Sequence, residues 1–248
     1  MSRFKNFVWE AGLLGATTIG AGVFALPYIF NESGWLLGIL YIGLISSLIF
    51  SVHLLYWQVL AKAGHGVKLL GLIRKYFGKA GYYSAFLIII GGLILTLVVY
   101  LILAREFIAL IFPLAGIREF ILFWLISSLP IILSLRRLIS LELLGAVLMG
   151  GIILFIFSTA STNGILERVP AFNFKNTLLP FSPIIFSLAA WTAIPPIYEY
   201  AKKTKSVGTR PPASALLSGT CFAALLYVIF AFAILGSTEK ITPDAISG

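Results

Sequence analysis

Two hydroxyls and two glycines lie close together near the start of the chain, within a strongly apolar segment. Thr17 and Thr18 precede Gly20 and Gly22, and Ala21 separates the two glycines. Glycine destabilises a helix interior by about 1 kcal/mol relative to alanine, so this segment favours unwinding at its centre. Unwinding frees peptide N–H and C=O groups, which can bind a polar solute or an ion. The pattern therefore predicts a binding site made chiefly of backbone.

A second apolar segment, much later in the chain, has the same character. Its candidate site residues are Phe186, Ser187, Trp191 and Thr192. Proline removes a backbone donor and clashes with the preceding turn, so Pro195 and Pro196 predict a kink or break in this helix. We expect the freed peptide groups of both segments to line one site.

The elements that position these segments are membrane helices. The chain of 248 residues is 60% hydrophobic and 11% charged, and a soluble domain of this size cannot bury so much apolar surface. The single cysteine excludes a disulfide framework. The sequence predicts one all-α integral membrane domain over residues 1–248. Its seven predicted spans are 8–30, 35–60, 81–113, 119–135, 139–158, 182–200 and 213–236.

Basic residues predict the orientation of these spans in the cell (cytoplasmic or inner) membrane. With a cytoplasmic N-terminus and an outside C-terminus, most of the 18 Lys and Arg residues fall inside, as the positive-inside rule requires. The exceptions outside are Arg118, Arg168, Lys175 and Lys240. The net charge of +9 follows from this topology and does not indicate a nucleic-acid partner. Residues 62–79 are predicted as a cytoplasmic interfacial helix and 159–181 as an extracellular loop.

The two interrupted spans are the first and the sixth, so they run in opposite directions across the membrane. Interrupted spans at matching places in two inverted halves are typical of the substrate site of a secondary transporter. Helix packing is the alternative explanation, because small residues such as Gly12, Ala16 and Gly20 also let membrane helices approach closely.

Both interrupted segments resemble a known family. The run from Thr17 to Tyr28 is similar to the first-helix signature of amino acid permeases, and the run from Phe186 to Pro195 resembles their broken sixth helix. The group resembled is the hydroxy/aromatic amino acid permease and amino acid/auxin permease branch of the amino acid–polyamine–organocation superfamily. The resemblance implies a LeuT-like inverted-repeat fold of five plus five helices. It also implies amino acid symport coupled to H+ or Na+, with no other cofactor.

The chain departs from this family in length, because the predicted spans supply one five-helix unit and two helices of a second. We therefore expect a C-terminally truncated permease. Its expected partners are the amino acid substrate, membrane lipid and a separately encoded C-terminal half. The alternative is a transport-incompetent fragment, or a membrane scaffold or receptor-like protein derived from a permease. No zinc, hydrolase, P-loop or Rossmann motif is present, so no enzymatic reaction is expected.

A zwitterionic substrate then gives each candidate residue a role. The α-carboxylate is expected at the freed N–H groups around Thr18, Gly20, Ala21 and Gly22, with a Thr17 or Thr18 hydroxyl as a further donor. The ammonium is expected at carbonyls of both interruptions near Phe186 and Ser187. Phe186, Trp191 and Tyr100 would enclose the side chain of a neutral or aromatic amino acid. A sodium site would use the carbonyls of Gly15 and Thr18. The candidate gate residues are Glu199, Arg105 and Glu106.

Overall fold

The computed structural model describes residues 2–63, 69–112, 116–133, 135–161, 164–203, 211–238 and 241–242. Within these ranges every regular element is helical. Five of the described helices are long and apolar enough to cross a membrane, or six if the bent pair Phe4–Thr18 and Ala21–Ser33 forms one span. Helices satisfy all their internal backbone groups, which lipid requires of a spanning segment. The described part is therefore an all-helical, multi-pass membrane protein.

The chain divides into two compact units, one made of residues 1–57 and 130–248 and the other of residues 58–129. Helix α3 (Trp35–Ala63) begins in the first unit and ends in the second. The second unit also holds α4 (Leu69–Ile111) and α5 (Ile117–Ser128). All residues predicted to bind substrate, except Tyr100, belong to the first unit.

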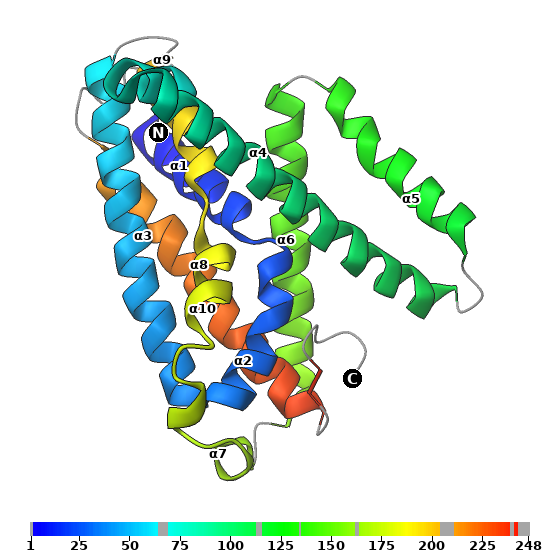
Figure 1. Ribbon diagram of the computed structural model, residues 1–248. Helices are drawn as coiled ribbons and strands as arrows, with labels where there is room; N and C mark the ends of the chain where they lie inside the picture. Colours follow the sequence, from blue (N-terminus) through cyan, green and yellow to red (C-terminus); the bar gives the residue numbers. More distant parts are fainter. Residues whose placement is uncertain are drawn as a thin grey trace. The chain divides into compact units, whose positions relative to one another are not determined.

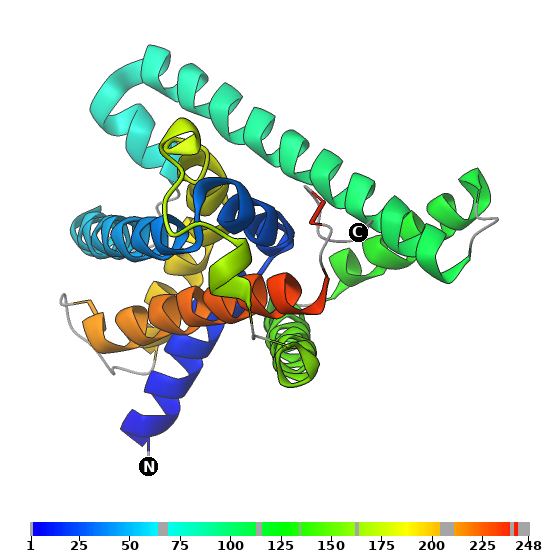
Figure 2. The same cartoon turned by 90° about the horizontal axis from the view of Figure 1, so that it is seen from below.

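Helix α10 (Ala213–Ser237) is the centre of the first unit. It packs against α1 (Ser2–Thr18), α6 (Leu135–Thr159) and α2 (Leu26–Ser33), and Figure 1 and Figure 2 show it crossing α6. Its residues are apolar on all sides, which is typical of a membrane-spanning helix. Small residues bring α1 and α10 together, since a Cβ placed on Gly219 would lie only 2.7 Å from the carbonyl oxygen of Ala11.

The first predicted span is not one continuous helix. Helix α1 ends at Thr18, Ile19 and Gly20 are not helical, and a short 3₁₀ helix, η1 (Ala21–Ala25), leads into α2. The segments before and after the interruption are bent by 53° relative to each other. Pro27 lies in the first turn of α2, where its missing N–H removes no helical hydrogen bond.

The sixth predicted span is also interrupted, but not at its prolines. Helix α8 (Phe181–Leu188) ends before Ala189 and Ala190, and η4 (Trp191–Ala193) leads into α9 (Ile194–Lys203). The prediction of a break at Pro195 and Pro196 is therefore wrong by about five residues. Both prolines lie in the first turn of α9, where a helix tolerates residues that lack an N–H group.

The fourth predicted span, residues 119–135, is shorter than expected. Helix α5 ends at Ser128, and a 3₁₀ turn, η2 (Leu129–Ile132), follows it. Pro130 explains this end, because proline lacks the N–H group that would continue the α-helical hydrogen bonds. Twelve residues of α-helix span about 18 Å, well short of the ~30 Å hydrocarbon core. This segment accounts for the difference between seven predicted spans and at most six found in the described residues.

Two of the predicted connections take defined forms. Gly78 (φ 69°) interrupts α4, so residues 69–77 form a separate short helix at the end of the predicted interfacial segment 62–79, of which 64–68 lie outside the described residues. The predicted loop 159–181 contains α7 (Ile165–Arg168) and η3 (Phe174–Asn176). Its Asn173 donates a backbone hydrogen bond to the carbonyl of Ser33 and a side-chain one to that of Glu32, both 2.8 Å long. The loop thereby satisfies the carbonyl end of α2.

Candidate functional site

The first interruption, Ile19–Gly20, leaves a row of peptide donors without partners. Within the described residues, the N–H groups of Gly20, Ala21 and Gly22 donate no hydrogen bond. Gly20 and Ala21 are half-buried and Gly22 is buried. These donors stand at the N-terminal end of η1 and α2, where the helix dipole favours an anion. The geometry suits a carboxylate, as the sequence predicts for the substrate.

The second interruption, Ala189–Ala190, has the same property. No hydrogen bond from the N–H groups of residues 189–192 is found in the described part of the chain. Ala189 and Thr192 are exposed, whereas Ala190 is buried. The interruption therefore offers both accessible and enclosed peptide groups.

The two interruptions are packed against each other. A Cβ placed on Gly22 would lie 2.3 Å from Oγ and 2.8 Å from Cα of Ser187. A contact this close requires glycine, because rotation of the serine side chain would relieve the first overlap but not the second. The approach brings η1 against the end of α8, so segments far apart in the sequence share one site.

One side chain of α10 joins the two interrupted helices. The Tyr227 hydroxyl is 2.5 Å from the carbonyl oxygen of Thr18 and 2.8 Å from that of Ser187. Tyr227 is fully buried, with 0% of its surface exposed. We call Thr18 O and Ser187 O the carbonyl pair. Each belongs to the last turn of its helix, α1 or α8, and so converges on the same point from a different element.

The carbonyl pair carries concentrated negative charge. The terminal carbonyls of a helix are left without partners by the helix itself, and the dipole places about −0.5 of a charge there. Two such ends meet at the Tyr227 hydroxyl, which is neutral and has a single proton to donate. This arrangement favours a cationic donor, such as an ammonium group, at the same point.

The hydroxyls of Thr18, one of the two predicted hydroxyl donors, and of Ser187 are already used within their own helices. Thr18 Oγ1 donates to Leu14 O at 2.7 Å, and Ser187 Oγ donates to Pro183 O at 2.7 Å. Both bonds connect residues four apart, the usual way for a hydroxyl in a membrane helix to satisfy its proton. These two side chains can therefore accept a hydrogen bond in this arrangement but have no proton left to donate.

The other predicted site residues lie around this point with different exposure. Thr17 and Trp191 are half-buried, and Phe186 is 43% exposed. Gly15 is buried, and a Cβ there would lie 3.3 Å from the Phe222 ring of α10, so this glycine serves helix packing. The Gly15 carbonyl accepts a hydrogen bond from Ile19 N at 3.0 Å.

The predicted gate residues belong to different units of the chain. Glu199 is exposed on α9, where the Lys202 ammonium lies over the Tyr198 ring, 5.7 Å from its centroid. Arg105 and Glu106 belong to the second unit, in which Arg105 is exposed and Glu106 half-buried. Their role as gates stays a prediction.

Tyr227 is the site residue that the sequence analysis missed. The sequence did indicate that Tyr227 has a hydrogen-bond partner, because a tyrosine in the middle of an apolar span must find one for its hydroxyl. The sequence did not say which partner, since the two carbonyls lie 209 and 40 residues away.

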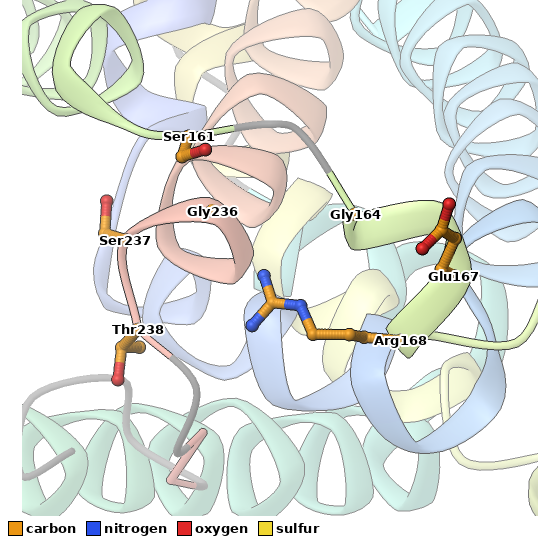
Figure 3. Close-up of a pocket in the computed structure, with 7 residues that line it drawn as sticks. All are labelled: Ser161, Gly164, Glu167, Arg168, Gly236, Ser237 and Thr238. Carbon is orange, nitrogen blue, oxygen red and sulfur yellow. The ribbon is translucent and has the colours of Figure 1, made fainter.

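A separate open cavity of about 500 Å³ lies at the end of α10, away from the predicted site residues. Its lining residues are Ser161, Gly164, Glu167, Arg168, Gly236, Ser237 and Thr238. In Figure 3 the Arg168 side chain extends from α7 toward the end of α10. Its Nη2 donates to Leu235 O at 3.1 Å, so Arg168 caps the carbonyl end of α10.

Comparison with known proteins gives one match. The family model described as transmembrane amino acid transporter protein matches residues 8–234. This range includes both interruptions and Tyr227. Neither a curated protein nor a solved structure matches the chain.

Proposed function

The chain belongs to the transmembrane amino acid transporter family, and we propose that it carries neutral or aromatic amino acids across the cell membrane by symport. Membership of a transporter family agrees with the absence of enzyme motifs in the sequence. The observation that supports a substrate site most strongly is the packing of Gly22 against Ser187, which unites two helix interruptions.

The proposed mechanism is alternating access in a LeuT-like inverted repeat. In this proposal, the two interruptions are the breaks of the first and sixth transmembrane helices of that fold. Half-helices that end within the membrane can tilt separately, so the same site can open to one side and then to the other. The N-terminus would be cytoplasmic, as the distribution of basic residues favours.

In this proposal, the substrate binds through its common zwitterion. The ammonium donates to the carbonyl pair, where two helix C-termini supply negative charge. The carboxylate accepts from the N–H groups of Gly20, Ala21 and Gly22, at the start of η1. Binding the shared part of all amino acids by backbone leaves selectivity to the side-chain pocket.

The side-chain pocket in this proposal includes Phe186, Trp191 and Thr192, which favour an apolar or aromatic substrate. The coupling ion is H+ or Na+. For sodium, Thr18 O and Gly15 O each accept one hydrogen bond and have a second lone pair, so both retain capacity as ligands.

The test is uptake into proteoliposomes that contain the 248-residue chain. Tritiated L-phenylalanine, L-tryptophan, L-leucine and L-serine are supplied outside, under an inward gradient of protons or of sodium. We expect accumulation of at least one of them above its outside concentration, and an ionophore that dissipates the effective gradient should abolish it. Failure of all four amino acids to accumulate under both gradients would contradict the proposal.

A further inference from the structure

Tyr227 occupies the point that the substrate ammonium requires. Its Oη lies 2.5 Å from Thr18 O and 2.8 Å from Ser187 O. An ammonium nitrogen donating to the same two oxygens needs a position about 2.8 Å from each. The hydroxyl and an ammonium cannot both occupy the position between the two oxygens where the hydroxyl lies, so an ammonium that binds there must displace the hydroxyl.

The hydroxyl is also a weaker partner for the carbonyl pair than an ammonium. A phenol has one proton, and two acceptors share it, so at least one carbonyl is incompletely satisfied. An ammonium carries a full positive charge and three N–H donors, and charge-assisted hydrogen bonds are about twice as strong as neutral ones. The exchange of hydroxyl for ammonium therefore favours the bound state.

Burial makes the hydrogen bonds of the Tyr227 hydroxyl important when no substrate is bound. Tyr227 is fully buried, and a buried carbonyl without a donor is costly in a membrane interior. By bridging the ends of α1 and α8, the hydroxyl gives the two carbonyls a shared donor and holds the two interruptions together at the Gly22–Ser187 contact.

We propose that Tyr227 is a positioning residue that closes the empty site. Its hydroxyl bridges the carbonyl pair when no substrate is present, and the substrate ammonium displaces it. This inference rests on the proposed transport function and adds a specific competitor for the amino group. Tyr227 belongs to α10, which is not part of either interruption.

The central variant is Tyr227→Phe, which removes only the hydroxyl. The probe is whichever of tritiated L-phenylalanine, L-tryptophan, L-leucine and L-serine the wild type accumulates fastest. Because the competitor is absent and the empty state loses one hydrogen bond, we expect the Kd of the variant to fall about fivefold. We also expect net uptake to decline relative to exchange, since the empty carrier must return through the state that the hydroxyl stabilises.

The control is Tyr41→Phe, the same substitution on a half-buried tyrosine of α3 that packs against the core. It should leave the Kd and the ratio of net uptake to exchange unchanged. A merely structural loss at position 227 would weaken binding, which is the opposite of the expected result. Equal or weaker binding by Tyr227→Phe therefore overturns the proposal, and weaker binding would make the hydroxyl a substrate ligand instead.

A second variant keeps the test decisive if Tyr227→Phe does not fold. Incorporation of 3-fluorotyrosine at position 227 nearly preserves the shape and makes the hydroxyl a stronger donor. We expect binding to weaken about two- to threefold, because the competitor now holds the carbonyl pair more firmly. Unchanged or tighter binding would overturn the proposal. The absence of uptake by the wild type would instead reject the proposed transport function, so the two failures are distinguishable.

Discussion

Gly20 and Gly22 have different tasks, although the sequence presents them as a pair. Gly20 adopts an extended conformation, with φ −142° and ψ −167°, which other residues also reach. Gly22 instead meets Ser187 so closely that any side chain would collide with its backbone. Glycine is thus required at position 22 by the neighbouring helix and not by its own backbone conformation.

Replacement of Gly22 by alanine is therefore expected to abolish amino acid uptake. The added Cβ would lie 2.8 Å from Ser187 Cα, so η1 and α8 must separate and the carbonyl pair loses its geometry. Insertion into the membrane should continue, because the apolar spans are unchanged. The measurement is uptake per amount of inserted protein in proteoliposomes.

The matched control is Gly145→Ala on α6, where a Cβ meets nothing within 4 Å. This variant should transport at the wild-type rate. Wild-type uptake by Gly22→Ala would show that the contact between the interruptions has no part in transport.

At the scale of the elements, the packing of α1 on α10 depends on small residues. A Cβ on Gly219 would lie 2.7 Å from Ala11 O and 3.0 Å from Leu14 Cβ, so the two helices must move apart to accept it. The same helices carry Thr18 and Tyr227, which means that their spacing also sets the hydrogen bond between them.

We expect Gly219→Ala to destabilise the protein by about 2 kcal/mol through overpacking of this interface. Gly43→Ala on α3 is the matched control, because its Cβ would meet nothing within 4 Å and alanine favours the helix. Thermal unfolding in detergent should give a lower Tm for Gly219→Ala than for the wild type and for Gly43→Ala. An equal or higher Tm for Gly219→Ala would contradict the close approach of α1 and α10.

The prediction of these elements from sequence succeeded where composition alone decides. Long apolar runs gave α3, α4, α6 and α10 within a few residues, apart from the helical extension of α4 back to Leu69. The prediction failed at Pro195 and Pro196, because proline disrupts the interior of a helix but is tolerated in its first turn. Only the structure shows that these two prolines lie in a first turn. The prediction also overestimated α5, whose end is determined locally by Pro130.

At the scale of the whole molecule, the candidate site was predictable in part. Weak helix formers indicated the interruption in the first span, since unwinding is a local property of the sequence, whereas the prolines placed the one in the sixth span about five residues too late. The contact between them and the role of Tyr227 depend on tertiary packing, which brings residues 187 and 227 to Thr18 and Gly22. A single sequence carries no signal for that juxtaposition.

The central claim is that the amino group of the substrate binds where the two interruptions converge. The most direct test is a distance measured by solid-state NMR between the ¹⁵N-labelled amine of the bound amino acid and the ¹³C-labelled carbonyl of Thr18. That carbonyl can be assigned because Thr18-Ile19 is the only Thr-Ile dipeptide in the chain. We predict dipolar dephasing that corresponds to about 3.5 Å, the length of one hydrogen bond plus the carbonyl geometry. A bound amino acid that causes no dephasing of the Thr18 carbonyl would contradict the account.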